Sequence, residues 1–378
     1  MTPFTSPDVV VVGGGVIGCS IAYHLAREGA RVGVVEREQL ASGASGIAAG
    51  MLAPQVEAPF ADAFFELTLA GRATHAQLAE RLHDEVGLDV EYRATGILRV
   101  ARTESERVDL QRMHRWQTAR GLRAEWLEPA ALGDCEPLLA GVAGRLLAGG
   151  LWLPDEAQVR SPRLVEALAS AATQRGARIY ESTWAVALER AGDRVCGVRT
   201  QNGIVHAGTV VLAAGVWSAD LARGVGLDLP LVPVKGQVVT LQARDARPRH
   251  VIWSGDCYLV PRVDGQVLLG ATEEEGNYDA RPTLAGVGRL SESVLEFVPA
   301  AGSLHFEGAW AGLRPAVPDR RPIVGQAPSL EQLVVATAHY RNGVLLGPLT
   351  GQAVADLILR DHLPHEWAPF GVERFLTG

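Results

Sequence analysis

The chain has 378 residues, of which 47% are hydrophobic, so it can bury the cores of two packed domains. Its formal net charge is -8, which excludes nucleic acid as the main partner, because phosphate binding requires clustered Lys and Arg. A small anionic ligand stays compatible with this charge, since one or two Arg residues are enough to bind it.

We expect a cytoplasmic protein that does not cross a membrane and has no metal site. The first eight residues lack the basic and apolar segments of a signal peptide, and glycines interrupt the apolar stretch that follows them. The cysteines are scattered without metal-binding spacing, as is typical of a reducing compartment: Cys19, Cys135, Cys196 and Cys257.

The first predicted unit is a strand, a glycine-rich turn, a helix and a second strand. The strand covers residues 9–12, and the helix that follows the glycines runs through Arg27, where Gly29 closes it as a C-cap would. The second strand covers residues 31–35 and leads to Glu36. This order predicts a βαβ unit of a parallel sheet.

Further elements follow without a repeat or a Pro-rich linker, so we expect two domains that interleave along the chain. Amphipathic patterns predict three helices, at 61–83, 104–120 and 161–175. Ser161 is the predicted N-cap of the third helix. Strand-like runs lie at 178–180, 184–189, 194–200 and 209–213, and a β-rich pattern covers 230–310. A strand at 333–337 and a helix at 349–360 close the order.

The glycine-rich turn fits the dinucleotide-binding pattern G-x-G-x-x-G in its required context between a strand and a helix. Gly13 allows the tight turn, Gly15 lets a pyrophosphate approach the backbone, and Gly18 lets the helix pack on the strand. Glu36 is placed to accept hydrogen bonds from a ribose. The pattern predicts a dinucleotide at the N-terminus of this helix.

NAD and FAD both bind to this fold, so the glycine pattern leaves both open. Residues 208–217 form a predicted strand that ends in a small-residue turn containing Gly215. Such a turn is typical of FAD proteins, in which a later segment rejoins the dinucleotide sheet. A nicotinamide dehydrogenase with one such unit does not need this return, so the sequence favours FAD.

Several motifs between Asp8 and Asp361 together resemble the D-amino-acid oxidase family of FAD-dependent oxidoreductases, most closely its glycine oxidase branch in the thiamine pathway. Besides the glycine pattern with Glu36, they are SGASGIAAGMLAPQVE (42–57), GTVVLAAGVWS (208–218), CYLVPR (257–262), GAT (270–272), GLRPAVPDRRPIVG (312–325) and HYRNGVLLGP (339–348). The resemblance implies an α/β FAD-binding domain of the Rossmann type, interleaved with an α+β substrate domain on a mostly antiparallel sheet. The implied boundaries are 1–91, 158–231 and 314–378 for the first domain, and 92–157 and 232–313 for the second.

The resemblance and the glycine pattern imply a set of contacts to a noncovalently bound FAD. Ala185 stands where the family has a Val against the adenine, and residues 339–345 would pass the isoalloxazine ring. The implied cofactor residues are Gly13, Gly15, Val16, Ile17, Gly18, Glu36, Arg37, Ala44, Ser45, Ala49, Gly50, Met51, Ala185, Gly215, His339, Tyr340, Arg341, Asn342, Gly343, Val344 and Leu345.

Four residues are candidates for substrate binding. Arg314 matches the family's carboxylate-binding Arg, and a guanidinium binds a carboxylate with two parallel hydrogen bonds. Arg341 matches a second Arg that closes the site, and Tyr258 matches a Tyr that orients the carboxylate. Glu273 stands where glycine oxidases have a Met, so the choice among glycine, sarcosine and a small D-amino acid stays open.

The expected reaction is the oxidative deamination of a small amino acid, with oxygen reduced to hydrogen peroxide. Once the amine is neutral, orientation and desolvation suffice for hydride transfer to the flavin, so no further catalytic residue is expected. An alternative is a dehydrogenase of the same fold that passes electrons to a quinone or carrier. A non-catalytic flavoprotein would lack Arg314 or an intact glycine pattern. The resemblance also implies a homo-oligomer.

Overall fold

The computed structural model describes residues 6–244, 247–276 and 278–375. Six strands of this described chain form the first sheet, which is parallel except for its edge strand β19. In spatial order they are β19 (Ile323–Gln326), β20 (Leu333–Thr337), β12 (Thr209–Leu212), β1 (Val9–Val12), β2 (Val32–Val35) and β8 (Arg178–Tyr180). The return of β12 beside β1 confirms the predicted strand at 209–213 as part of the dinucleotide sheet.

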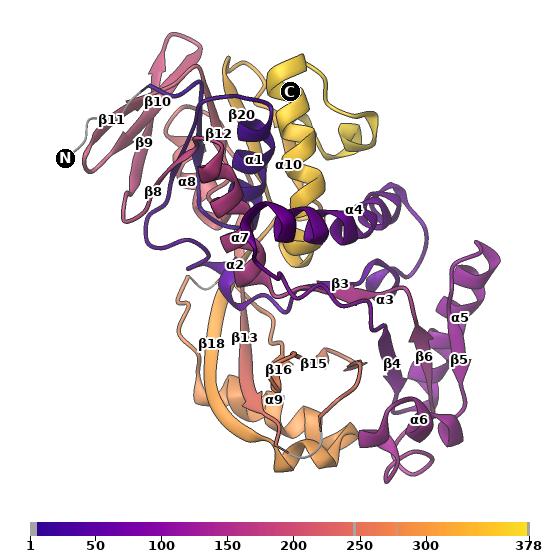
Figure 1. Cartoon of the computed structure of the whole chain (residues 1–378). Coiled ribbons are helices and arrows are strands. Elements are labelled where there is room, and N and C mark those ends of the chain that lie inside the picture. Colours follow the sequence, from indigo (N-terminus) through magenta and orange to yellow (C-terminus); the bar gives the residue numbers. More distant parts are fainter. Residues whose placement is uncertain (1–5, 245–246, 277, 376–378) are drawn as a thin grey trace.

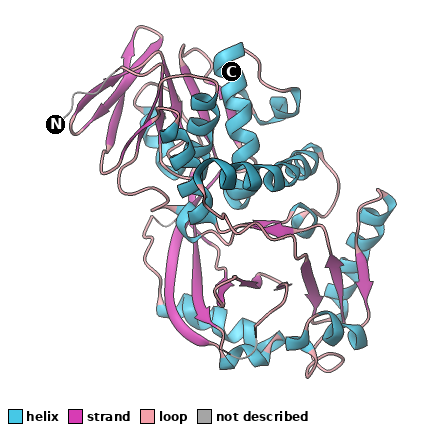
Figure 2. Ribbon diagram, viewed as in Figure 1, coloured by secondary structure: helices cyan, strands magenta, loops and turns pink. Residues whose placement is uncertain are grey.

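The first sheet lies between a layer of helices and a small second layer of strands (Figures 1 and 2). Alternate residues of β1 point to opposite faces, as a strand requires. Val9 and Val11 pack against the helices α1 (Val16–Arg27), α4 (Ala63–Val86), α7 (Ser161–Gln174) and α10 (Gly343–Arg360). Val10 and Val12 pack toward β9 (Ala185–Ala191), β10 (Arg194–Thr200), β11 (Gly203–His206) and α8 (Ser218–Arg223).

Nine other strands of the described residues form the second sheet, in the lower half of Figure 1, and all neighbours pair antiparallel except β4 with β14. Along the sheet lie β17 (Glu274–Glu275), β13 (Val232–Gln242), β16 (Gln266–Gly270), β15 (Cys257–Pro261), β14 (Val251–Ser254), β4 (Ile97–Ala101), β6 (Gly149–Leu153) and β5 (Glu125–Leu127), while β18 (His305–Ala316) pairs with β13. The helices that pack on this sheet are α5 (Glu104–Ala119), α6 (Pro129–Cys135) and α9 (Leu284–Phe297).

A two-stranded ribbon connects the sheets, formed by β3 (Met51–Leu52) and β7 (Ala157–Gln158). Two short helices flank β3, α2 (Ala44–Ile47) before it and α3 (Pro54–Glu57) after it. The strands of the first sheet fall within 1–91, 158–231 and 314–378, whereas β18 crosses residue 314, so the domain boundaries remain a proposal. No helix in the described ranges is long and apolar enough to cross a membrane.

The last long helix begins at Gly343, earlier than the predicted start at Leu349. Proline lacks the N–H that a helix interior uses, so a proline such as Pro348 disfavours a helix that continues through it. In the structure Pro348 lies inside α10, and the ring of His75 from α4 lies 3.0 Å from the carbonyl oxygen of Leu345 in the same turn. The His75 ring thus provides a hydrogen-bond partner for a carbonyl oxygen in the turn that contains Pro348. Because His75 belongs to another helix, sequence periodicity does not reveal this contact.

The predicted N-cap role of Ser161 is wrong. Helix α7 includes Ser161, and Arg160 is its N-cap residue without a side-chain cap. The Ser161 hydroxyl instead donates to the carbonyl oxygen of Ser45 at 2.6 Å. A contact far away in the sequence therefore takes the side chain that local propensity assigned to the helix start.

A buried carboxyl group holds α3 in place. Oε1 of Glu156 accepts the backbone N–H of Gln55 at 2.7 Å and lies 3.3 Å from Nη1 of Arg72, while Oε2 has no partner among the described residues. Burial raises the pKa of Glu156 to about 8, although Arg72 and the Gln55 N–H oppose this shift. The carboxyl is thus mostly protonated at neutral pH in the folded chain.

We expect Glu156→Gln to remove a pH-dependent loss of stability. The pKa of Glu156 is higher in the folded chain, about 8, than its ordinary 4.5, so its stabilising contribution is complete below 4.5 and is lost as pH rises through 8. Relative to the variant, the wild type should lose on the order of 4 kcal/mol of unfolding free energy between about pH 5 and about pH 9. Urea unfolding across this range measures the difference, and a constant difference would contradict the prediction.

Candidate active site

A cavity of about 740 Å³ lies between the two sheets. Its lining includes residues at the carboxyl ends of the parallel strands, namely Val12, Val35, Ala213 and Thr337. Ligands of open α/β sheets bind at such strand ends. Tyr258 and Arg314 from the second sheet also line the cavity, so both sheets contribute to a single site.

The glycine-rich turn brings the backbone to the cavity at close range. Gly13 has a φ of +112°, and a Cβ added there would overlap the carbonyl oxygen of Ala213. A Cβ at Gly18 would overlap the carbonyl oxygen of Gly13, so this glycine allows α1 to pack onto the turn. Gly13 and Gly15 line the cavity, whereas Gly18 does not.

The start of α1 faces the cavity without a cap from its own N-cap residue, Gly15. The N–H of Val16 donates to Oγ of Ser45 at 3.0 Å, and the N–H of Gly14 donates to Oε2 of Glu36 at 2.7 Å. Glu36 also accepts the N–H of Glu38 at 2.9 Å through Oε1. Carboxylate oxygens have further lone pairs, so Glu36 can still accept from a ribose hydroxyl.

An aromatic wall borders the cavity near Ala185. The guanidinium of Arg37 lies 4.3 Å from the ring centroid of Trp217, and Trp184 and Val186 also line this region. Trp184 is 58% exposed, which is unusual for so large an apolar side chain unless a ligand covers it. Trp217 lies in the motif that contains Gly215, but sequence reasoning assigned it no role.

A second helix also presents its start to the cavity. Helix α10 begins at Gly343 after the N-cap residue Asn342, whose side chain makes no capping hydrogen bond, and both residues line the cavity. His339 lines it as well and lies 2.9 Å from Oγ1 of Thr350 through Nε2. Burial lowers the pKa of His339 to about 3, so the ring is neutral at physiological pH.

Arg314 brings a guanidinium to the cavity that is free of carboxylates. Its Nη1 donates to the carbonyl oxygen of Thr272 at 3.1 Å, and no ion pair of Arg314 occurs in the described part of the chain. The guanidinium lies directly over Gly236, where an added Cβ would overlap it. Gly236 therefore makes room for Arg314, a requirement that sequence reasoning missed.

Tyr258 and Trp253 form the wall beside Arg314. Their ring centroids are 5.2 Å apart, and both residues line the cavity. Burial raises the pKa of the Tyr258 hydroxyl, while the charges of Arg314 and Arg341 oppose the shift. The hydroxyl is therefore a neutral hydrogen-bond donor near two guanidinium groups.

Arg341 differs from Arg314 because carboxylates already contact it. Its Nη2 lies 3.0 Å from Oε1 of Glu57, and its Nη1 lies 3.8 Å from Oε2 of Glu273. Its guanidinium also lies 5.5 Å from the ring centroid of Trp253. Glu57 closes the motif at 42–57, but sequence reasoning gave this residue no role.

Glu273 does not line the cavity, and its carboxylate faces arginines instead. Oε1 accepts from Nη1 of Arg320 at 2.8 Å. Burial alone would raise the pKa of Glu273, but a hydrogen bond from Tyr340 and the charges of Arg320 and Arg341 bring it below its ordinary value. Glu273 therefore acts on the site only indirectly, through its ion pair with Arg341.

The structure brings most of the sequence-predicted residues to one cavity. Gly18, Leu345 and Glu273 are the exceptions, and Leu345 is a core residue whose carbonyl oxygen meets His75. The predicted residues in the cavity lining are Gly13, Gly15, Val16, Ile17, Glu36, Arg37, Ala44, Ser45, Ala49, Gly50, Met51, Ala185, Gly215, Tyr258, Arg314, His339, Tyr340, Arg341, Asn342, Gly343 and Val344.

These residues fit FAD. Two helix starts whose N-cap residues make no side-chain cap offer N–H groups and positive dipole ends to the same cavity, which suits the pyrophosphate and the electron-rich edge of a flavin. Glu36 can serve the ribose, and the wall of Trp184 and Trp217 can cover the adenine. In the residue ranges described, no group of three or more His, Cys, Asp or Glu is placed to hold a metal ion.

Comparison with known proteins agrees with this geometry. The DAO family model, described as FAD dependent oxidoreductase, matches residues 8–357. A glycine oxidase of Geobacillus kaustophilus is 37% identical over 370 residues, which cover 98% of this chain and 97% of that protein. A crystal structure of glycine oxidase from the same species has a TM-score of 0.93 at 37% identity and covers 98% of this chain and 100% of that chain. The bifunctional protein ThiO/ThiG of a Synechocystis species is 34% identical over 99% of this chain and 55% of that protein.

The family match spans nearly the whole chain, including the glycine-rich turn, Arg314 and the start of α10. Relatives more than 30% identical cover it almost completely. The chain therefore belongs to the DAO family of FAD-dependent oxidoreductases, as an FAD-dependent amino-acid oxidase of the glycine oxidase kind.

Proposed function

We propose that the enzyme oxidises glycine, and more slowly sarcosine and small D-amino acids, at the carbon that bears the amine. Two electrons and two protons leave the substrate, oxygen takes them up as hydrogen peroxide, and water hydrolyses the imine of glycine to glyoxylate and ammonia. The free guanidinium of Arg314 at the end of the cavity is the observation that carries this proposal.

Arg314 would bind the substrate carboxylate through two parallel N–H groups. Its contact with the carbonyl oxygen of Thr272 and its position over Gly236 hold the guanidinium in one orientation. The Tyr258 hydroxyl, which is neutral and close to both guanidinium groups, would donate to the same carboxylate. A carboxylate held at two points leaves the amine and the α-carbon in a defined direction.

The bound flavin supplies the acceptor for the hydride that leaves the α-carbon. The chain itself contributes orientation and exclusion of water, because His339 is neutral and the nearby carboxylates of Glu57 and Glu273 pair with arginines. None of these groups is a free base in this arrangement. The substrate amine must therefore reach the site neutral, or release its proton to solvent, before the hydride leaves.

We further propose that the product feeds thiazole synthesis in the thiamine pathway. The likeness to the bifunctional protein ThiO/ThiG supports this step, since this chain covers about half of that protein. The alternative acceptor is a quinone or carrier, as in dehydrogenases of the same fold. Peroxide release in aerobic buffer without an added acceptor distinguishes oxygen from a carrier.

Anaerobic addition of substrates tests the substrate assignment. Glycine should bleach the flavin absorbance fastest, sarcosine and D-alanine more slowly, and L-alanine not at all. Because the reduced flavin cannot be reoxidised without oxygen, each bleaching rate reports hydride transfer alone. The measurement is stopped-flow absorbance of the purified holoenzyme. If none of these amino acids bleaches the flavin, the proposal fails.

Replacing Arg314 should separate substrate binding from flavin binding. We expect Arg314→Ala to lower kcat/KM for glycine by about 100-fold or more, because it removes a charged pair of hydrogen bonds from the substrate carboxylate in the cavity. Arg314→Lys keeps the charge but not the fork, so it should recover only part of this loss. Both variants should retain FAD, measured by the flavin absorbance after gel filtration. Loss of FAD would show that Arg314 has another role.

Glu273→Gln should have a much smaller effect than Arg314→Ala. The pairs of Glu273 with Arg320 and Arg341 are partly exposed to solvent, so we expect a change in KM of about two- to fivefold with kcat nearly constant. Glu275→Gln is the matched control, because Glu275 pairs with Arg320 at 2.8 Å and has no described contact with Arg341. Steady-state kinetics with glycine provide the comparison. A 100-fold loss in Glu273→Gln would mean that Glu273 contacts the substrate directly.

A further inference from the structure

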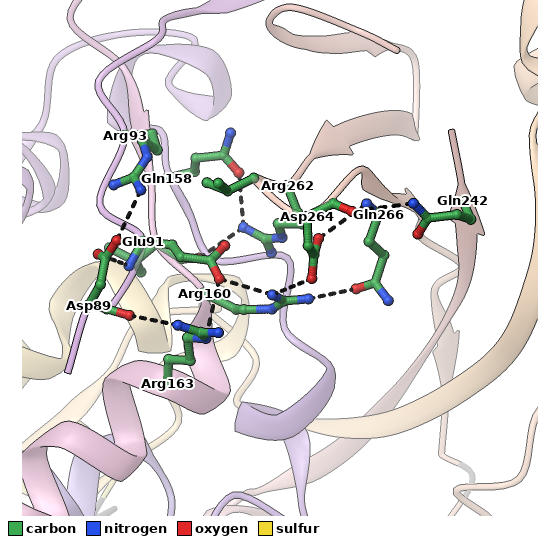
Figure 3. Close-up of polar contacts among 12 residues, drawn as sticks. Asp89, Glu91, Arg93, Gln158, Arg160, Arg163, Gln242, Arg262, Asp264 and Gln266 are labelled. Carbon is green, nitrogen blue, oxygen red and sulfur yellow. Dashed lines mark hydrogen bonds and ion pairs between the residues drawn. The ribbon is translucent and has the colours of Figure 1, made fainter. Parts of the chain in front are cut away.

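Two arginines cross the junction between the sheets in opposite directions (Figure 3). Arg160 follows β7 of the ribbon and reaches the turn between β15 and β16, where its guanidinium binds Asp264 at 2.8 Å and Gln266 at 3.1 Å. Arg262 begins that same turn and reaches back to the ribbon. Each arginine therefore anchors the segment from which the other comes.

Arg262 binds the end of β7 and the segment that leads into β3. Nη1 donates to Oε1 of Gln158 at 2.9 Å and to the carbonyl oxygen of Val159 at 3.1 Å. Nη2 donates to the carbonyl oxygen of Ala49 at 2.7 Å, just before β3. These three contacts use neutral oxygens only.

The charge of Arg262 is unusual for its surroundings. The residue is 6% exposed, and no carboxylate of the described chain forms an ion pair with it, whereas Arg160 pairs with both Glu91 and Asp264. Burial and the nearby Arg160 lower the pKa of Arg262 to about 10, so it remains charged at neutral pH. A buried cation costs free energy unless its hydrogen bonds are made, which explains why all three acceptors are close.

The acceptor at Ala49 belongs to the segment that lines the flavin cavity. Ala49, Gly50 and Met51 all line that cavity. On its other side the segment is fixed to the ribbon, since the N–H of Val159 donates to the carbonyl oxygen of Gly50 at 2.9 Å. Gly50 has a φ of +68°, and a Cβ there would overlap the carbonyl oxygen of Val159. The ribbon thus fixes the backbone of Gly50, and Arg262 fixes the carbonyl group of the preceding residue, Ala49.

Strand β15 links this contact to the substrate end of the cavity. Tyr258 lies within β15 and lines the cavity beside Arg314, and Arg262 follows directly after Pro261, the last residue of the strand. A shift of β15 would move the Tyr258 hydroxyl and the Arg262 guanidinium together. Strand β15 therefore connects the cavity-lining segment 49–51 to the wall that contains Tyr258.

We propose that Arg262 is a positioning residue of the flavin site, which holds the segment Ala49–Met51 against FAD from the second sheet. Its hydrogen bond to Ala49 fixes the distance between the flavin and the substrate wall that carries Tyr258. Because Arg262 lies behind a segment that lines the cavity, its positive charge would also stabilise negative charge on the flavin when the flavin is reduced.

The test compares FAD retention in variants of the holoenzyme. Arg262→Met keeps the length of the side chain but removes its donors and charge, so we expect FAD to dissociate with a Kd about tenfold or more higher. The flavin potential should also become more negative, because a buried cation is lost. Dilution of each holoenzyme, with released FAD followed by its fluorescence, gives the Kd, and dye-coupled reduction gives the potential.

Arg160→Met is the matched control, because it breaks contacts at the same junction without touching the flavin segment. It should lower the melting temperature but leave the Kd of FAD within about threefold and the potential unchanged. Arg262→Lys, which retains the charge and one donor, should restore the potential and part of the affinity. If Arg262→Met does not fold, the comparison of Arg262→Lys with Arg160→Lys serves the same purpose. We then expect a higher Kd of FAD only in Arg262→Lys.

Two results would overturn the proposal. If the Arg262 variants bind FAD with the wild-type Kd, the contact with Ala49 does not position the flavin segment. If the Arg160 and Arg262 variants weaken FAD equally, both residues stabilise the junction in a general way and Arg262 has no special role. Because neither readout uses a substrate, these results are independent of which amino acid the enzyme oxidises.

Discussion

Two helix starts that face one cavity determine which kind of ligand this fold can hold. The first N–H groups of a helix have no acceptor within the helix and need a side chain, water or ligand. Neither α1 nor α10 is capped by its own N-cap residue, and both open onto the same space. A ligand that reaches both helices must be long and must carry acceptors at two places, as FAD does. At Gly13 and Gly50 the cavity lining packs closely against the backbone of Ala213 and Val159.

At the substrate end of the cavity the chain provides charged arginine side chains instead of backbone N–H groups. Arg341 is already neutralised by Glu57 and approached by Glu273, whereas Arg314 has only a carbonyl oxygen. An anionic substrate gains more from a guanidinium that has no carboxylate partner, since it need not displace one. The two arginines are therefore not equivalent, although both stand in motifs that resemble those of the family. The cavity is prepared for one carboxylate rather than two.

The sequence predicted local patterns well and contacts across the fold poorly. The βαβ unit, the return of β12 and the family of the enzyme could all be read from short motifs, because such motifs combine periodicity with obligatory glycines. The start of α10 could not, since the support that His75 gives to the turn near Pro348 comes from another helix. Gly236 escaped notice for the same reason, as its importance lies in the guanidinium of Arg314 above it. No local signal distinguishes such a glycine from one in an ordinary strand.

The arginines in and around the site differ in the groups that balance their charge, and the sequence does not reveal this difference. Arg160 meets carboxylates, so its contribution is complete within the protein and concerns the junction alone. Arg314 meets one carbonyl oxygen and has donors left for a ligand. Arg262 is an intermediate case, since it donates to neutral oxygens of the chain, while Glu91 and Asp264, which attract its charge, form their ion pairs with Arg160. A buried cation that forms no ion pair is stabilised by a negative charge that forms nearby. The same physical argument therefore underlies both proposals, Arg314 for the substrate carboxylate and Arg262 for the cofactor.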